Sequence, residues 1–246
     1  MAIRKARGDE GPKASWMLSY GCLMTQLLVF FVMLFALANK TTEYQLTSIK
    51  KRVDSYIVQK NLQDVVRTDY TRKERGLVIS LGDKLMFESG KAEINNQAMD
   101  IIKDIAKVFR EDAEGRPYPN RVSVEGHTDN VRVRTDSPFA TNWELSSARA
   151  TNITRFLVEG LDFQPERLSS SGYAEWWPSP VNYQDIAEKE RLSMKPKDVV
   201  LHANSSPEKQ ARNRRVDIVI HRLEMDEMQQ WREELMKTVS KVVGKR

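Results

Sequence analysis

Two short stretches of this sequence carry side chains suited to binding a charged ligand. The first runs Glu125-Gly126-His127-Thr128-Asp129-Asn130, and the second holds Asn142, Ser146 and Arg149 on one predicted helix. Asp129 and Arg149 together could grip a zwitterion, because a carboxylate binds an ammonium group and a guanidinium binds a carboxylate in bidentate fashion. The alternative is an ordinary Asp–Arg pair that ties a loop to a helix, worth about 0–1 kcal/mol if exposed. Spacing alone does not choose between them.

Catalysis and metal binding find little support in the sequence. The three histidines are scattered, and His127 has no obvious nucleophile beside it. The one cysteine, Cys22, lies in an apolar stretch and excludes an internal disulfide framework. The net charge is +5, but acidic and basic residues alternate, which argues against a nucleic-acid-binding stripe. We therefore expect a binding protein that is not an enzyme, with no cofactor, no metal and no nucleic-acid partner.

An uncharged run from Trp16 to Ala38 is the second informative feature. As a helix, this run spans a hydrocarbon core of about 30 Å. It is preceded by basic residues, as a signal peptide would be, but it exceeds the roughly 7–15 apolar residues of a signal peptide. We predict an uncleaved transmembrane helix over residues 16–38. The basic residues on its two sides are nearly balanced, and they favour a cytoplasmic tail at residues 1–15 only because Lys50 to Arg52 lie farther from the span.

Polar residues share one face of this predicted helix. Ser19, Cys22 and Gln26 follow the spacing i, i+3 and i+7, and Thr25 lies beside them. Such residues commonly face a partner helix or a water-filled path. The alternative is that Ser and Thr bond back to their own helix. Gln26 is harder to explain in that way, which favours a partner-facing stripe.

The remainder of the chain alternates between strand and helix patterns. Residues 39–75 contain an amphipathic helix, with Leu46, Ile49, Val53, Tyr56 and Ile57 at helical spacing, followed by a linker. Short strands are predicted at 77–81, 122–124, 167–173 and 216–220, and capped helices at 96–109 and 141–160. Residues 179–206 are polar and of low predicted order. These patterns indicate an α+β fold in which an α/β sandwich of a mixed four-stranded sheet and packed helices spans residues 76–222, and an amphipathic helix follows over 223–246.

Several motifs carry a resemblance to a known family. WMLSYGCLMT from Trp16 to Thr25 resembles the N-terminal membrane segment of MotB-type flagellar stator proteins. The runs FESGKAEI, VEGHTDN, NWELSSARA and NRRVDIVI, which start at Phe87, Val124, Asn142 and Asn213, resemble the OmpA-like peptidoglycan-binding domain that ends those proteins. The resemblance implies a single-pass bacterial inner-membrane protein with a cytoplasmic N-terminus and a periplasmic domain. It also implies a homodimer inside a ring of MotA-type subunits, with a plug region at residues 39–75.

The resemblance assigns residues to the peptidoglycan site. It implies that Asp129 and Arg149 hold the diaminopimelate of the stem peptide. The residues that would frame the same site are Thr128, Asn142, Leu145, Ser146 and Arg215. The chain departs from the family pattern between Tyr173 and Asn213, where Ala174 replaces a usual glycine and an insertion follows.

The membrane segment departs further, because Cys22 occupies the position of the family's ion-binding Asp. A thiol is a much weaker acid than a carboxyl group, so it would not cycle between charge states as a carboxylate does. Three interpretations remain: a flagellar stator subunit whose Asp is replaced, a non-conducting wall-anchored scaffold, and a subunit of a non-flagellar ion-driven complex in defence or transport.

Overall fold

The computed structural model describes residues 13–70, 76–111, 118–184 and 186–223. The chain divides into two compact units, residues 1–45 and residues 46–246, which are considered separately. The predicted amphipathic helix at residues 223–246 lies outside the described residues, apart from its first position.

The first unit contains the N-terminal part of helix α1 (Lys13–Gln59). Its segment Trp16–Leu34 is long and apolar enough, by length and composition, to cross a membrane. The Thr25 hydroxyl donates hydrogen bonds to the carbonyls of Gly21 (3.0 Å) and Cys22 (2.9 Å). The Thr25 hydroxyl therefore finds its hydrogen-bond acceptors within its own helix. This agrees with the alternative interpretation, in which Ser and Thr of the polar face bond back to their own helix.

The second unit is built on a mixed five-stranded sheet in the order β1-β2-β5-β3-β4. Its strands are β1 (Val66–Tyr70), β2 (Gly76–Gly82), β3 (Val122–His127), β4 (Leu168–Gly172) and β5 (Arg215–His221). Strands β3 and β4 are parallel, and the other neighbouring pairs are antiparallel. The predicted α/β sandwich is confirmed, and four of the five strands lie where the sequence places them.

The predicted strand count of four is wrong, because β1 lies in the segment that the sequence predicts to be a linker. Only Val66 of this strand is buried, and its sequence VRTDY lacks an alternating apolar pattern. Strand β1 pairs on one side only, with β2, so it forms an edge of the sheet. Charged residues are usual on edge strands, where they discourage pairing with other chains. Its pairing with β2, and not its own hydrophobicity, makes this segment a strand.

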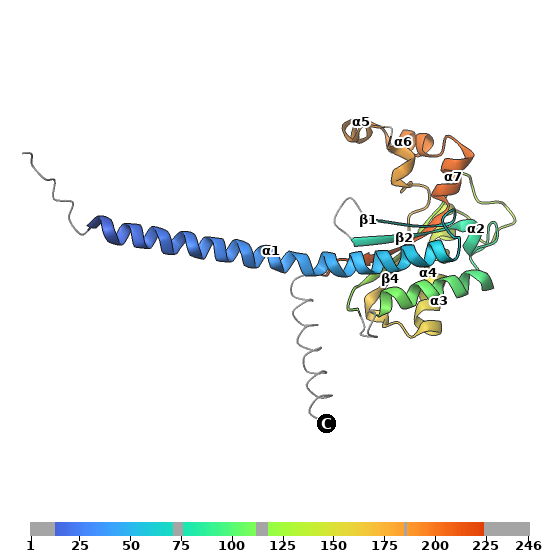
Figure 1. Ribbon diagram of the computed structural model, residues 1–246. Coiled ribbons are helices and arrows are strands. Elements are labelled where there is room, and N and C mark those ends of the chain that lie inside the picture. The colour runs from blue at the N-terminus through green and yellow to red at the C-terminus, as the bar shows by residue number, and fades with distance from the viewer. Residues whose placement is uncertain (1–12, 71–75, 112–117, 185, 224–246) are drawn as a thin grey trace, which may run out of the picture. The chain divides into compact units, whose positions relative to one another are not determined.

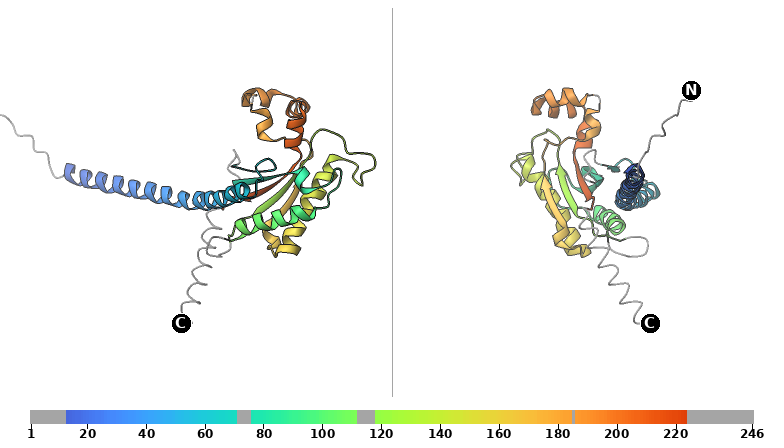
Figure 2. Two further views of the ribbon diagram at one scale, coloured as in Figure 1. Left: turned by 45° about the vertical axis from the view of Figure 1, so that its right-hand side comes forward. Right: turned by 90° about the vertical axis from the view of Figure 1, so that its left-hand side faces the viewer.

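Helices cover one face of the sheet (Figures 1 and 2). They are the C-terminal part of α1, α3 (Asn96–Arg110) and α4 (Asn142–Arg155), which continues as a π-helical turn over Phe156–Gly160. The buried residues of α3 recur at helical spacing, and the Asn95 side chain caps its first turn by accepting from the Ala98 N–H at 2.7 Å. Alternate residues of the strands complete the core, among them Leu77, Ile79, Leu81, Val124, Val216, Ile218 and Ile220.

The C-terminal part of α1 belongs to this core. Leu46, Ile49, Val53 and Ile57 are all buried in it. Polar contacts hold the same segment to α3: the Arg52 guanidinium donates to the carbonyl of Glu111 at 2.8 Å, and the Tyr56 hydroxyl donates to Asp104 at 3.0 Å. The compact unit thus begins at Leu46, and the boundary that the sequence suggests at Gly76 falls inside it.

Residues 179–184 and 186–206 form regular elements in the structure, so the prediction of low order is wrong for them. They form a 3-10 turn (Pro180–Tyr183), α5 (Glu188–Ser193) and α6 (Pro196–Ala203), and α7 (Pro207–Asn213) follows. Three buried amides join these elements: Asn182 donates to Asn213 at 2.8 Å, and Asn213 donates to Asn204 at 2.8 Å. Buried side-chain hydrogen bonds, which leave no hydrophobic period in the sequence, organise this segment.

Truncating a side chain in the α1 part of the core should destabilise the second unit. Ile49 is fully buried, so Ile49→Ala should lower the free energy of unfolding by about 2–5 kcal/mol through lost contacts and a residual cavity. Lys51→Ala, two residues away on the exposed side of the helix, should change it by less than about 0.5 kcal/mol. Urea unfolding followed by circular dichroism measures both. Equal stability of the two variants would contradict the packing of α1 on the sheet.

Candidate binding site

The site depends on a close approach between α4 and the ends of β3 and β4. A Cβ atom added at Gly126 would lie 2.0 Å from the Ser146 carbonyl oxygen, and one added at Gly172 would lie 2.2 Å from Ser147 Oγ. Both distances are far inside van der Waals contact, so only glycine fits at these two positions. The glycines therefore let α4 lie directly against the strands, next to the loop that follows β3.

Capping interactions fix the start of α4 and the loop beside it. The Thr141 hydroxyl accepts from the Glu144 N–H at 3.4 Å, and the Glu144 carboxylate accepts from the Ala140 N–H at 2.6 Å. This is close to the predicted capping box, although the reciprocal bond reaches one residue further back. The Asn142 amide donates to the carbonyls of Asp129 (3.3 Å) and Val131 (3.0 Å). Asn142 thereby holds the loop after β3 against the helix.

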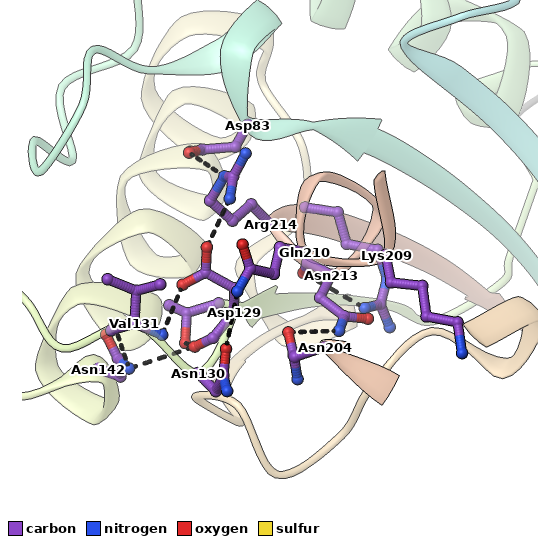
Figure 3. A network of polar contacts seen from close by, with 12 residues as sticks. Asp83, Asp129, Asn130, Val131, Asn142, Asn204, Lys209, Gln210, Asn213 and Arg214 are labelled. Carbon is purple, nitrogen blue, oxygen red and sulfur yellow. Dashed lines mark hydrogen bonds and ion pairs between the residues drawn. The ribbon is translucent and has the colours of Figure 1, made fainter. Parts of the chain in front are cut away.

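Four charged side chains of alternating sign form the centre of the site, and we call them the charged row. Arg149 Nη1 lies 2.9 Å from Asp83 Oδ1, Arg214 Nε lies 4.0 Å from Asp83 Oδ2, and Arg214 Nη1 lies 2.5 Å from Asp129 Oδ2. Figure 3 shows Arg214 between the two carboxylates. The row thus runs Arg149, Asp83, Arg214, Asp129.

Asp129 and Arg149 therefore each have a different ion partner from the one the sequence suggested. Asp129 pairs with Arg214, and Arg149 pairs with Asp83. Asp129 still acts on Arg149 through space: burial lowers the pKa of that guanidinium, and the charge of Asp129 is among those that oppose this shift. The simple Asp129–Arg149 pair is replaced by two pairs that meet at Asp83 and Arg214.

Burial gives the charged row its electrostatic character. Burial raises the pKa of Asp83, and the cationic Arg149 and Arg214 oppose this shift. Burial also lowers the pKa of Arg149, and the charge of Asp83 opposes that shift. The Arg149 guanidinium lies 4.8 Å from the centre of the Phe87 ring, and its Nε donates to the Lys91 carbonyl at 3.0 Å. These contacts hold the charged end of Arg149 in one orientation.

Three of the predicted framing residues are buried in the loop after β3 or on α4. Thr128, Leu145 and Ser146 are buried, and the Thr128 hydroxyl donates to the Asp129 carbonyl at 3.0 Å. Ser146 Oγ accepts from the Ala174 N–H at 3.1 Å, and the Thr128 N–H donates to the Ala174 carbonyl at 2.9 Å. Ala174 has φ 49°, a left-handed conformation that glycine adopts more readily than alanine. The loop after β4 therefore keeps a conformation suited to glycine despite the alanine.

Arg215 lies apart from the charged row. Its Nε donates to both carboxylate oxygens of Asp217, at 3.1 and 3.0 Å, and His127 Nε2 lies 3.4 Å from Asp217 Oδ2. Arg214 lies just before β5 and pairs with Asp129 and Asp83, whereas Arg215 is the first residue of β5, so the two neighbours face different surroundings. Of the two neighbouring arginines in the motif NRRV, Arg214 joins the charged row, and the predicted Arg215 pairs with Asp217.

Asp217, His127 and Arg215 form a second buried charged cluster. Burial alone would raise the pKa of Asp217, but the Arg215 guanidinium and His127 outweigh it and hold that pKa below its ordinary value. Burial and the charge of Arg215 lower the pKa of His127 to about 4, although Asp217 opposes the shift. The Tyr173 ring stacks on His127 with centroids 5.5 Å apart. His127 is thus neutral near pH 7 and supports the loop after β4.

Sequence reasoning missed Asp83 and Arg214, the two residues in the middle of the charged row. Asp83 follows β2 directly, at the start of the short helix α2 (Asp83–Met86), and its N–H donates to the Arg214 carbonyl at 3.0 Å. Nothing in the local sequence around Asp83 points to residues 129 or 214. Among the described residues, no group of three or more His, Cys, Asp or Glu side chains is arranged to hold a metal ion.

Comparison with known proteins shows which families and folds this chain is similar to. Residues 86–192 match the OmpA family, and residues 3–52 match the family described as membrane MotB of the proton-channel complex MotA/MotB. A crystal structure of a MotB-like protein from Desulfovibrio vulgaris superposes with a TM-score of 0.55 at 22% identity, covering 76% of this chain and 99% of that one. The second unit is therefore an OmpA-like domain.

Two Bacillus subtilis proteins are similar over most of the chain. Motility protein B is 28% identical over 176 residues, which cover 72% of this chain and 56% of that protein. The uncharacterized protein YtxE is 26% identical over 214 residues, which cover 72% of this chain and 85% of that protein. The chain thus combines a match to the MotB membrane segment with a match to the OmpA family, and in this order it is similar to the MotB-type stator proteins that the sequence motifs predict.

The low pKa of His127 makes the stability of the second unit depend on pH. Between pH 6.5 and 4 the unfolded chain binds a proton at this residue that the folded chain does not, so stability falls as the pH falls. The loss attributable to His127 should be about 2 kcal/mol between pH 7 and pH 5. Urea unfolding at both pH values should show this loss in the wild type and a smaller one in His127→Gln. An identical pH dependence in the two proteins would contradict the buried, neutral state of His127.

Proposed function

We propose that this chain anchors a membrane stator complex to peptidoglycan through its OmpA-like domain, which binds the polymer without cutting it. The observation that supports this most is the pair of charges at the two ends of the charged row. Asp129 and Arg149 both lie within the residues that match the OmpA family, and both are buried at the junction of α4 with the loop after β3. A buried, unlike pair of charges suits a ligand that carries both an ammonium and a carboxylate group.

The stem peptide of peptidoglycan offers such a ligand at its diaminopimelate residue. In our proposal Asp129 binds the ammonium group, and the Arg149 fork binds the carboxylate. Thr128, Asn142, Leu145 and Ser146 frame the site, since they hold the loop after β3 and line α4 beside it. Arg215 acts indirectly in this scheme, because its guanidinium is engaged with Asp217.

Loss of either charge should weaken attachment to the wall without unfolding the domain. Arg149→Ala removes a bidentate charged contact and should weaken binding by about 1.5–3 kcal/mol, and Asp129→Ala should act similarly. Co-sedimentation of each variant with purified sacculi measures binding, and circular dichroism checks the fold. Arg155→Ala on the same helix is the matched control, because its side chain is 65% exposed and pairs with Glu159. Full sedimentation of both site variants would return Asp129 and Arg149 to purely structural roles.

The membrane part of the proposal concerns partners and orientation. The match of residues 3–52 to the MotB family supports a complex with a MotA-type subunit ring, which would enclose two copies of this chain. We place residues 1–15 in the cytoplasm and the OmpA-like domain in the periplasm, with the span at residues 16–38 in the inner membrane. The plug role falls within residues 39–75, of which residues 46–70 also pack in the second unit.

We further propose that Cys22 makes this chain a poor ion conductor on its own. It takes the place of the family's ion-binding Asp, and no other ionisable side chain except Tyr20 occurs between residues 14 and 39. Packing and neutral hydrogen bonds still allow Ser19, Cys22 and Gln26 to face a partner ring. A non-conducting scaffold, or a subunit of a non-flagellar ion-driven complex, is the second candidate function.

Restoring the carboxylate should restore ion flow. Co-expressed with its cognate A-type subunit, the unmodified chain should assemble but conduct poorly, and Cys22→Asp should conduct, because a carboxylate supplies the charge that a translocated cation needs. Membrane-vesicle ion flux measures the difference, and Cys22→Ser, which stays neutral, is the control. Strong ion-driven rotation by the unmodified chain as the only B-type subunit would contradict the proposal.

A further inference from the structure

The two middle members of the charged row differ in how firmly they are held. The side chains of Arg149, Asp83 and Asp129 are 4%, 12% and 8% exposed, whereas that of Arg214 is 29% exposed. Arg214 also contacts two carboxylates at once, Asp129 at 2.5 Å and Asp83 at 4.0 Å (Figure 3). Arg214 is therefore the member of the row that can change partner with the smallest movement.

We propose that Asp83 and Arg214 make this site specific for a zwitterion by exchanging partners when the ligand enters. This inference rests on the proposed function, in which Asp129 binds an ammonium and Arg149 a carboxylate. Without ligand, the pairs are Asp129 with Arg214 and Asp83 with Arg149. With ligand, the pairs become Asp129 with the ammonium, Arg149 with the carboxylate, and Asp83 with Arg214, which already lie within ion-pair distance. Every buried charge keeps a partner in both states.

A ligand with one charge breaks this balance. An anion that pairs with Arg149 leaves two protein carboxylates and one guanidinium. Asp83 and Asp129 must then share Arg214. A cation that takes Asp129 leaves Asp83 between Arg149 and Arg214. An unpaired or shared buried charge is costly, since its lost hydration is not replaced. The burial that raises the pKa of Asp83 reflects the same cost. The two middle residues thus penalise a ligand that brings only one charge.

The segment from Pro180 to Asn213 has a part in this scheme, because it holds the backbone from which Arg214 projects. Asn213, the residue before Arg214, is fully buried; its amide donates to the Ala203 carbonyl at 2.9 Å, and its oxygen accepts from the Ser179 N–H at 2.9 Å. On the same helix, Gln210 donates to Asn130 at 3.2 Å (Figure 3). The backbone is thereby fixed beside the loop after β3, and the partner exchange is confined to the Arg214 side chain.

Titration calorimetry of the full chain in detergent tests the exchange with three small probes. These are meso-diaminopimelate, which carries both charges at each end, pimelate, which has only the carboxylates, and cadaverine, which has only the ammonium groups. We expect meso-diaminopimelate to bind and the two single-charge probes to bind at least about tenfold more weakly. Equal affinity for the three probes, or no binding of meso-diaminopimelate, would overturn the proposal.

The variant Asp83→Asn/Arg214→Gln removes both internal partners and leaves the net charge unchanged. It should bind meso-diaminopimelate about three- to tenfold more tightly than the wild type, because the ligand no longer competes with Arg214 and Asp83. It should also discriminate less against pimelate. Arg155→Gln/Glu159→Gln is the matched control, since it removes one exposed pair from α4 and should leave the probe affinities unchanged. Weaker binding by the Asp83/Arg214 variant would show that Arg214 contacts the ligand directly and would overturn the exchange.

Sedimentation with sacculi separates this inference from the proposed function. A chain that discriminates among the probes as expected but does not sediment with sacculi would contradict wall binding and support the exchange. A chain that sediments with sacculi but binds the three probes equally would support wall binding and overturn the exchange. If the double variant fails to fold by circular dichroism, the wild-type probe series decides by itself.

Discussion

The contact between α4 and the ends of β3 and β4 is the constraint on which the site depends. At Gly126 the strand backbone lies so close to the Ser146 carbonyl that no side chain fits between them. This approach places Ser146 within hydrogen-bonding distance of Ala174 and brings Arg149, one turn further along α4, over the Phe87 ring beside Asp83. A wider spacing would separate the helix from the loop that carries Asp129. Backbone packing, more than any single ion pair, therefore sets the geometry of the binding site.

Two charged clusters with different roles lie on this scaffold. Around His127, Asp217 and Arg215, burial and a tight pair hold the charges in one state, and that cluster supports the loop after β4. In the charged row, Arg214 is shared between two carboxylates and is partly open to solvent. Buried ion pairs contribute little net stability, because desolvation offsets their attraction. A row of near-balanced pairs suits recognition better than it suits stability, since a ligand can replace one pairing by another at small cost.

The membrane segment separates two properties that a stator subunit normally combines. Assembly of helices in a bilayer requires packing and hydrogen bonds, which Ser19, Cys22 and Gln26 can supply. Ion transfer requires a group that gains and loses charge, and the segment from residue 14 to 39 carries no carboxylate. Under the proposed function, an OmpA-like domain joined to a neutral membrane helix fits a wall anchor more directly than an ion channel.

The sequence by itself determined the elements with a strong hydrophobic period or a capping signal, such as the helix capped at Asn95, and its motifs led to Asp129 and Arg149. It did not reveal β1, because an edge strand with one buried residue becomes a strand only through its partner. Nor did it reveal the turn and helices between residues 180 and 184 and between 188 and 203, because the buried amides of Asn182, Asn204 and Asn213 leave no periodic pattern. Asp83 and Arg214 are 131 residues apart in sequence, yet they adjoin each other just beyond the paired ends of β2 and β5. Their meeting with Asp129 and Arg149 is decided by strand pairing and by the glycine-dependent approach of α4, which only the tertiary structure contains.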